Sequence, residues 1–521
     1  SSIVTGWLYP VLGGVSIFLA FERFNLLPTL FLLPFFLDHM RRLPLKQKLR
    51  AYWVMAIVTN LGGFYWISNV ARDYGGLPPV ASWGVVLVFG LFNNLNFVLW
   101  AYLERFFGER ANPFIIAALF CVAEQLNPQV FPWYLGTALD SALVLYQTAD
   151  LFGVIGLSFV AVTLIHIPWW LWRHRKTLWR EHRFPLAAQL AFVLFVVAYG
   201  VVALQRYGNQ PGPDKKQVGI ALIQSNTSLE KYYGARLSDA ERLAEFQAIV
   251  DLSQKAIDAS PTKVDLVVWP EGSVHFPILN SPLVFAKIAR LARDNRVYVT
   301  AGSAEIEGRN ADGRWVYYNT EFVLDPRGEI IGKYRKIVLL AFGEYIPLRD
   351  KLPFLEKWLP DTISNFSRGQ TKPIFAIDEK AHWLPLICYE DIISGFINGF
   401  DHRRADFLVN ITNDGWFGKS SASHLHKQMA RPRTVEYRKP MVRALNTGTS
   451  QIIDAAGRTI SKETEQYVRD YIDLTLNLPQ APPVTLYSII GNAPIYLVIA
   501  VVALLWLRKT FFARQRQKRP V

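Results

Sequence analysis

The feature that most constrains the fold is a series of long apolar stretches separated by short polar connections. A helix that crosses a bilayer needs about 20 mostly apolar residues. Stretches of this kind predict about eight membrane-spanning helices, at 5–22, 24–40, 51–70, 79–103, 113–131, 150–172, 184–205 and 486–507. Pro28 and Pro34 interrupt the second stretch, and Glu124 lies in the fifth. Residues 1–205 and 486–507 are therefore expected to form a helical membrane bundle.

The lysines and arginines of the connections alternate from one side of the predicted bundle to the other. Such residues gather on the cytoplasmic side of membrane proteins. They occupy the second connection (Arg41, Arg42, Lys46, Lys48, Arg50), the fourth (Arg105, Arg110), the sixth (Arg173, Arg175, Lys176, Arg180, Arg183) and the tail at 508–521 (Arg508, Lys509, Arg514, Arg516, Lys518, Arg519). The odd-numbered connections carry little beyond Arg23 and Arg72. The pattern predicts cytoplasmic termini and places the segment 206–485 on the opposite face.

The net charge of +14 fits this arrangement. The basic clusters lie beside apolar runs, which favours membrane topology over a nucleic-acid-binding face, so no nucleic-acid partner is expected. The two cysteines, Cys121 and Cys388, allow no disulfide framework. His424 and His426 are two residues apart and do not share a helix face, so no metal site is predicted.

The segment 206–485 has a different pattern, in which short apolar strands alternate with helices. Ser238 is a candidate N-cap for the first of these helices. Strands are expected at 217–224, 264–269, 296–301, 315–324, 329–334 and 406–411, with another leading into Cys388 and more after Met441; helices are expected at 239–259, 281–295 and 423–437. This alternation predicts an α/β layered domain.

The stretch 385–390 reads Pro-Leu-Ile-Cys-Tyr-Glu and places a thiol at the end of an apolar strand. A cysteine in such a position is most often a small buried hydrophobe. It becomes a candidate nucleophile if the chain also supplies a base and an oxyanion stabiliser, because a free thiol has a pKa of about 8.5.

Two further strand ends carry groups that would meet this requirement. Glu271, in the triplet Trp-Pro-Glu, would act as a general base; the alternative is a turn with a solvated carboxylate. Lys336 would present its ammonium to a developing oxyanion, with Glu344 holding it in place; the alternative is an exposed basic strand end. Three such strand ends in one domain favour a thiol-based acyl-transfer site.

The order Glu271, Lys336, Cys388 resembles the Glu-Lys-Cys triad of the nitrilase superfamily of carbon–nitrogen hydrolases. The whole chain, spans included, resembles a membrane family within it, the bacterial apolipoprotein N-acyltransferases. The motifs that carry the resemblance are Trp-Pro-Glu at 269–271, Phe-Gly-Glu-Tyr-Ile-Pro at 342–347, Phe-Ser-Arg-Gly at 366–369, Cys-Tyr-Glu at 388–390, Asn-Asp-Gly-Trp-Phe-Gly at 413–418, His426 through Glu436, Asn446-Thr447-Gly448, Phe-Tyr-Trp-Ile-Ser at 64–68 and Phe-Pro-Trp at 131–133. Ala341 and Lys439 stand where the family usually has Pro and Arg.

The resemblance implies an α-β-β-α sandwich at 206–485, on the periplasmic side of the bacterial inner membrane, and a ping-pong reaction without a cofactor. Cys388 would take an acyl chain from a phospholipid as a thioester, and the α-amine of a diacylglyceryl-cysteine apolipoprotein would receive it. Glu271 would be the base, and Lys336 would stabilise the oxyanion. The supporting residues would be Glu344, Tyr389 (through its backbone N–H) and Glu390. The enzyme is expected to act as a monomer.

Lipid substrates give the membrane bundle a purpose. Drawing an acyl chain into water costs about 0.8 kcal/mol per methylene, so an apolar groove beside the catalytic domain is expected. Trp66 and Trp133 are candidates to line it, although interfacial anchoring explains them equally well. Tyr232 and Tyr233 are candidates for a lid, and Trp416 for a substrate contact.

Two rival functions follow from the same residues. A membrane-anchored amidase or nitrilase would share the triad and use water as the acceptor, but a single anchor helix would suffice for it. A transporter or non-catalytic scaffold would be expected to carry intramembrane charges along a path, and Glu124 is the only plain candidate in the predicted spans.

Overall fold

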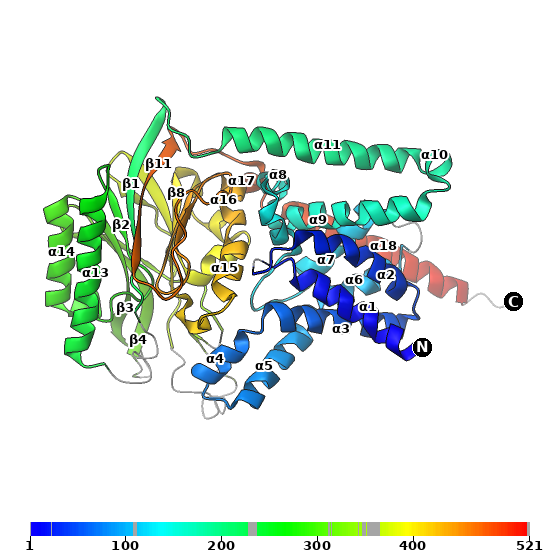
Figure 1. Cartoon of the computed structure of the whole chain (residues 1–521), viewed down its shortest axis with the longest axis horizontal. Coiled ribbons are helices and arrows are strands. Elements are labelled where there is room, and N and C mark those ends of the chain that lie inside the picture. The colour runs from blue at the N-terminus through cyan, green and yellow to red at the C-terminus, as the bar shows by residue number, and fades with distance from the viewer. Residues whose placement is uncertain are drawn as a thin grey trace. The chain divides into compact units, whose positions relative to one another are not determined.

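The computed structural model divides the chain into two compact units (Figure 1). The first comprises Ser1–Tyr65, Trp83–Gln205 and Thr485–Val521, and the second comprises Trp66–Ser82 and Arg206–Val484. The structure describes residues 2–21, 23–107, 112–227, 237–310, 313, 315–341, 343–345, 351 and 365–517, without the side chains of 2–6 and 510–517. The division assigns a short piece of the chain's first half, Trp66–Ser82, to the second unit, which the predicted boundary at 205/206 did not foresee.

The first unit is helical. Its helices are α1 (Ser2–Phe18), α2 (Leu33–Arg41), α3 (Leu45–Gly63), α5 (Pro79–Phe92, which begins in the second unit), α6 (Asn96–Glu104), α7 (Pro113–Leu126), α8 (Leu143–Tyr146), α9 (Ala149–His174), α10 (Leu178–Glu181), α11 (Arg183–Arg206), α17 (Leu486–Ile490) and α18 (Ala493–Gln517), with 3₁₀ turns η1 (Leu27–Leu32) and η3 (Leu135–Ser141). Gly153 interrupts α9 with φ +67°, and a β-carbon there would lie 2.4 Å from the ring of Tyr487. Only glycine fits this position.

Fewer helices than expected are long enough to span a bilayer. Among the described residues, three pass by length and apolarity: Pro79–Glu104, Ala149–His174 and Arg183–Arg206. The pair α3 and α4 (Ile67–Asp73) adds a fourth if it forms one broken span. The predicted total of about eight spans is therefore not established by helix length alone.

The stretch 24–40 shows why apolar composition overestimates helix length. Pro28 and Pro34 each occupy the first turn of a separate element, η1 and α2. Proline is tolerated there because its missing N–H is not needed, and here each proline stands where a new element begins. The nine residues of α2 rise only about 14 Å, about half the hydrocarbon thickness.

Two buried glutamates in the first unit accept hydrogen bonds from other groups of that unit. The carboxylate of Glu124 accepts a hydrogen bond from the Leu135 N–H at 2.8 Å, which explains how an acidic residue fits an apolar helix. Glu104 accepts from Arg41 Nη2 at 2.6 Å and from Lys48 Nζ at 3.2 Å. Two of the basic residues counted in the second connection thus lie inside the unit, bound to an acid on α6.

The second unit contains two stacked sheets. One has six strands in the order β11-β1-β2-β3-β4-β5, and the other has five in the order β10-β9-β8-β7-β6. The strands are β1 (Lys215–Gln224), β2 (Leu266–Val268), β3 (Tyr298–Arg309), β4 (Trp315–Leu324), β5 (Ile330–Arg335), β6 (Phe375–Ile377), β7 (Ala381–Ile387), β8 (Phe407–Thr412), β9 (Met441–Leu445), β10 (Gln451–Ile453) and β11 (Asp470–Pro479). The predicted α/β layered domain is confirmed.

Helices cover both outer faces of the sheet pair. In Figure 1, α13 (Asp239–Ala259) and α14 (Pro282–Asn295) lie on one side, and α15 (Ala422–Ala430) and α16 (Pro432–Tyr437) on the other. Ser238 caps α13 as predicted, in a capping box with Glu241. The single helix expected at 423–437 was wrong, because Pro432 starts a new helix there.

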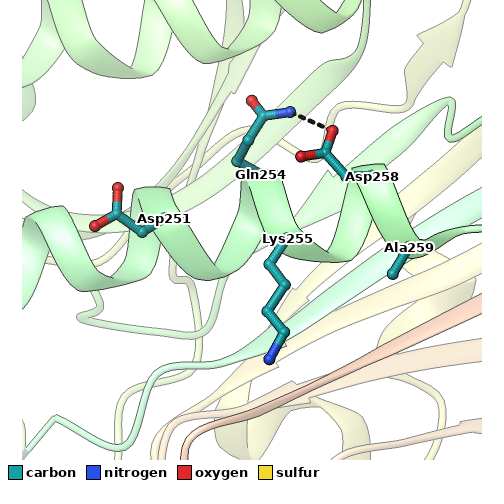
Figure 2. Close-up of a pocket in the computed structure, with 5 residues that line it drawn as sticks. All are labelled: Asp251, Gln254, Lys255, Asp258 and Ala259. Carbon is teal, nitrogen blue, oxygen red and sulfur yellow. Dashed lines mark hydrogen bonds between the residues drawn. The ribbon is translucent and has the colours of Figure 1, made fainter.

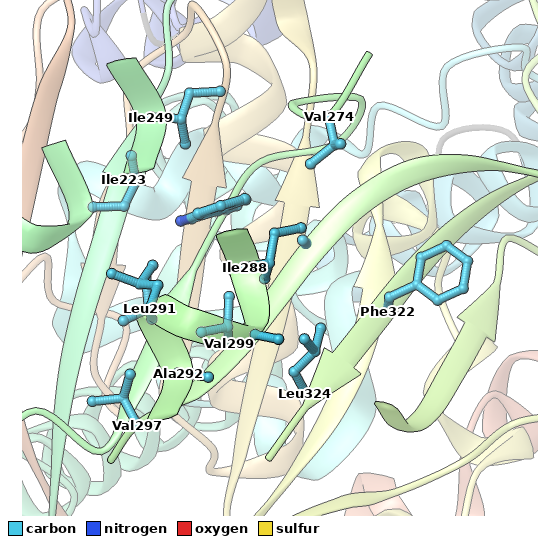
Figure 3. Packing of buried hydrophobic residues seen from close by; sticks show 14 of the residues in the cluster. Ile223, Ile249, Val274, Ile288, Leu291, Ala292, Val297, Val299, Phe322 and Leu324 are labelled. Atoms are coloured by element: carbon cyan, nitrogen blue, oxygen red, sulfur yellow. The ribbon is translucent and has the colours of Figure 1, made fainter. Parts of the chain in front are cut away.

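An apolar core joins α13 and α14 to the six-stranded sheet. It includes Ile249 of α13, Ile288 of α14, and Ile223, Val299 and Phe322 of the sheet, each at most 1 % exposed (Figure 3). This core fixes the sheet from which the polar strand ends project.

A shallow hollow of about 540 Å³ lies on α13 (Figure 2). Its lining residues are Asp251, Gln254, Lys255, Asp258 and Ala259. They come from one helix and include none of the predicted site residues, so the hollow is separate from the chemistry described next.

Candidate active site

Three strand ends carry the predicted reactive groups. Glu271 follows β2, Lys336 follows β5, and Cys388 opens the 3₁₀ turn η6 (Cys388–Ile392) directly after β7. Glu271 is 6 % exposed and Lys336 is 1 % exposed, whereas Cys388 is partly accessible. A buried lysine requires partners for its charge, and the structure supplies them.

The ammonium of Lys336 lies between two carboxylates. Its Nζ donates to Oε1 of Glu271 at 3.2 Å and to Oε1 of Glu344 at 2.8 Å. The amide Nδ2 of Asn319, on β4, donates to the same two oxygens at 2.6 and 3.0 Å. The cation and the amide together hold the two acids at a fixed spacing. The structure therefore brings Glu271, Lys336 and Glu344 together.

The second oxygen of each acid is held by the backbone. Oε2 of Glu271 accepts from the Asn413 N–H at 2.8 Å, and Oε2 of Glu344 accepts from the Leu340 N–H at 2.9 Å. Asn413 stood in a motif, but no role for it was predicted. Asn319 gave no sequence signal, because a polar residue on a strand is ordinary.

Cys388 adopts a backbone conformation that is rare for its residue type. Its φ is +51°, in the left-handed region. Residues other than glycine in this region cost about 1–3 kcal/mol and persist only where the surroundings impose them. The amide of Asn410 on β8 donates to the Cys388 carbonyl at 3.2 Å and helps to impose it. Such a turn projects the side chain out of the strand that precedes it.

The three groups perturb one another electrostatically. Burial raises the pKa of the Cys388 thiol well above its usual value; Glu271 raises it further and Lys336 lowers it. Burial also raises the pKa of Glu271 against the opposing effect of Lys336. For Lys336, burial alone would lower the pKa, but Glu271 and Glu344 outweigh it and raise the pKa well above the usual range. At neutral pH Lys336 is therefore an ammonium and Cys388 a neutral thiol.

Glu390 ties the Cys388 turn to the segment after Lys336. It is fully buried and accepts hydrogen bonds at 2.7–3.0 Å from the N–H groups of Ile337, Val338 and Ile387 and from the hydroxyl of Tyr334. Burial raises the pKa of Glu390 to about 7, against the opposing effect of these backbone N–H groups. Through these hydrogen bonds Glu390 links the turn at Cys388 to the segment after Lys336, which fits the supporting role predicted for it.

The candidate substrate contacts Trp66 and Trp416 lie on neighbouring elements of the second unit. The ring of Trp66 is 4.7 Å from that of Phe417, and the ring of Trp416 is 4.8 Å from that of Tyr74, at the end of α4. The Tyr74 hydroxyl also donates to the Gly415 carbonyl at 3.0 Å. Helix α4 is thus fastened to the 3₁₀ turn η9 (Asp414–Phe417), which follows the N–H that holds Glu271.

The structure describes two of the remaining candidate site residues, Trp133 and Tyr389. Trp133 belongs to the first unit, where it is buried and packs 4.2 Å from the ring of Phe21. Tyr389 follows Cys388 in η6 and is half-buried. Tyr232 and Tyr233 lie outside the described residues. Over the part of the chain that the structure describes, no group of three His, Cys, Asp or Glu side chains is arranged to hold a metal ion.

Family models match both halves of the chain. The carbon-nitrogen hydrolase model matches residues 219–480, and the model for the apolipoprotein N-acyltransferase N-terminal domain matches residues 13–167. The second match distinguishes this chain from an amidase with a simple membrane anchor, because it covers most of the first unit.

Two bacterial relatives agree with these matches. The apolipoprotein N-acyltransferase of Geobacter metallireducens is 34% identical over 466 residues, covering 87% of this chain and 85% of that protein. The one from Bdellovibrio bacteriovorus is 32% identical over 442 residues, covering 80% and 78%. A solved Saccharomyces cerevisiae member of branch 10 of the nitrilase superfamily is 17% identical, covers 53% of this chain and 93% of its own, and has a TM-score of 0.38. The coverage and identity of the bacterial relatives show that this chain belongs to the apolipoprotein N-acyltransferase family.

Proposed function

We propose that this protein transfers an acyl chain from a membrane phospholipid to the α-amine of the diacylglyceryl-cysteine of an apolipoprotein, through a thioester on Cys388. The observation that carries the mechanism is the Lys336 ammonium held between Glu271 and Glu344, within electrostatic reach of the thiol. A fixed ammonium next to a thiol and a base is suited to acyl transfer. One chain supplies all of these groups, so a monomer suffices.

The first half-reaction loads the enzyme. Glu271 takes the thiol proton as the sulfur attacks the ester carbonyl, and a carbon–sulfur bond forms. Lys336 and the backbone N–H of Tyr389 stabilise the oxyanion of the tetrahedral intermediate. The carbon–oxygen bond to glycerol then breaks, the glycerol oxygen takes the proton from Glu271, and lysophospholipid leaves.

The second half-reaction passes the acyl chain to the amine. The nitrogen attacks the thioester carbonyl and gives its proton to Glu271, which returns it to the leaving sulfur. A thiolate is a good leaving group, so the thioester favours amide formation. The raised pKa of Glu271 suits this role, because a base that must also donate works best when its pKa is near the ambient pH.

The acyl-enzyme is directly testable. Full-length protein incubated with vesicles of phosphatidylethanolamine and phosphatidylglycerol, without any lipoprotein, is expected to gain one acyl mass per chain. Peptide mass spectrometry should place that mass on Cys388, because no apolipoprotein α-amine is present to accept the acyl chain. Neutral hydroxylamine should release it, since hydroxylamine cleaves thioesters.

Cys121 is the internal control for this experiment. It is 3 % exposed on α7 and its thiol lies 3.5 Å from the Ile155 carbonyl, so it should stay unmodified. An acyl mass on Cys121, or none on either cysteine, would contradict the proposed mechanism.

We also propose that residues 206–485 lie on the periplasmic side of the inner membrane, with about eight spans elsewhere in the chain. The alternation of basic connections supports this orientation, as do the charged residues Arg41 and Lys48 near one end of the bundle's helices. A periplasmic site would face the leaflet in which exported apolipoproteins are anchored.

Reporter fusions check this topology. Alkaline phosphatase, which is active only after export, should be active when inserted between 206 and 214 and inactive when fused after Val521. Green fluorescent protein, which fluoresces when it folds in the cytoplasm, should give the opposite pattern. An active phosphatase at Val521 would require the predicted orientation to be abandoned.

A further inference from the structure

A histidine joins two buried carboxylates, one of which lies in the same turn as the candidate nucleophile. His426, on α15, is 5 % exposed. Its Nε2 lies 2.9 Å from Oδ1 of Asp391, and its Nδ1 lies 2.9 Å from Oδ1 of Asp414. Ionised carboxylates only accept hydrogen bonds, so both ring nitrogens donate and the ring is an imidazolium.

The charges around this ring balance. Asp391 and Asp414 are 0 % and 2 % exposed, and the guanidinium of Arg443 on β9 donates from Nε to the other oxygen of Asp391 at 3.2 Å. Burial alone would lower the pKa of His426, but the two carboxylates outweigh it and raise the pKa to about 9. The cluster thus contains two acids and two cations, which makes its burial tolerable.

The two acids belong to the two elements that carry the reaction. Asp391 lies three residues after Cys388, in the same turn η6. Asp414 begins η9, directly after Asn413, whose N–H holds Oε2 of Glu271. The ring of His426 therefore connects the turn of the thiol to the loop that orients the base.

We propose that His426 is a positioning residue, which sets the distance between the Cys388 thiol and Glu271 by locking η6 to η9. Its ring nitrogens bind Asp391 and Asp414 rather than Cys388 or Glu271. Two charge-assisted hydrogen bonds to buried acids give a stiffer link than neutral contacts would. This proposal rests on the proposed function, because it concerns the formation of the same thioester.

The test measures single-turnover acylation of Cys388 against the concentration of phosphatidylethanolamine and phosphatidylglycerol vesicles. His426→Leu removes both hydrogen bonds and should lower the limiting acylation rate about 100-fold, since a displacement of about 1 Å at the reacting centre has an effect of this size. The half-saturating lipid concentration should stay unchanged. His426→Asn retains a donor near Nδ1, and His426→Gln retains one near Nε2. Each should recover part of the rate.

His424→Gln, on the same helix, is the matched control and should acylate like the wild type. If the wild type forms no thioester, the proposed function fails, and this proposal with it. If the wild type acylates and a folded H426L protein does so equally fast, or changes only the half-saturating concentration, the positioning role alone is overturned. If H426L has no thermal unfolding transition, wild-type rates in both H426N and H426Q would overturn that role instead.

Discussion

Replacement of Cys388 by alanine is expected to abolish acyl transfer while leaving the protein folded. The side chain would lose the only atom that can form the thioester, and removal of a covalent nucleophile lowers turnover by at least about 10⁴-fold. The left-handed backbone at this position already tolerates a β-carbon, so alanine adds no strain. We expect the melting temperature to change by only a few degrees.

Lipoprotein N-acylation in membranes and thermal unfolding in detergent together measure this outcome. Cys121→Ala is the matched control, because it removes the other cysteine, which is buried in the first unit, and should preserve transfer. Residual transfer near the wild-type rate in C388A would show that another group carries the acyl chain.

Replacement of Lys336 by methionine is expected to affect both rate and stability. Loss of an oxyanion stabiliser lowers the rate about 10²–10³-fold. The carboxylates of Glu271 and Glu344 would then share the amide of Asn319 without a cation, and breaking a buried ion pair in this way costs about 3–5 kcal/mol. Both effects would appear in a protein of nearly unchanged side-chain volume.

The stability loss in K336M should grow with pH. Burial already raises the pKa of Glu271 in the wild type, and without the opposing ammonium this folded-state pKa should rise further. An acid with a raised folded-state pKa destabilises the folded state once it ionises, so the deficit relative to the wild type should increase as the pH rises above the wild-type folded-state pKa of Glu271. Thermal unfolding at pH 5 and pH 8 measures the difference.

Lys333→Met, on β5 three residues before Lys336, is the control for this experiment. Its Nζ pairs with Glu305 at 2.6 Å, but its side chain is 41% exposed, so its loss should cost under about 1 kcal/mol. Equal effects of K333M and K336M, or a deficit in K336M that shrinks as pH rises, would argue against the buried cation bridge.

Local signals in the sequence predicted the layered domain well. The strand at 315–324 matches β4, and the cap at Ser238 begins α13, because alternation and capping depend on near neighbours in the chain. Apolar windows served less well in the first unit. An apolar window measures only the average hydrophobicity of a stretch. It does not show that Pro28 and Pro34 divide the stretch 24–40 into two short elements.

The candidate site was only partly predictable for a related reason. Strand ends pointed to Glu271, Lys336 and Cys388, since polar residues after buried strands stand out. The amide of Asn319 and the N–H of Asn413 reach the acids across 48 and 142 residues of chain, and no local pattern encodes such contacts. The left-handed turn at Cys388 likewise depends on its surroundings, because cysteine has no preference for that conformation.

The contacts between α4 and η9 limit where the chain can be cut to give a separate catalytic fragment. A fragment cut at Arg206 would lack Trp66 and Tyr74, and the rings of Trp416 and Phe417 would lose their partners. Those rings belong to the same loop as Asn413, whose N–H donates to the carboxylate of Glu271. The second unit therefore cannot be excised at Arg206 without losing residues that pack within it. Hybrids between relatives should exchange residues 66–82 and 413–418 together.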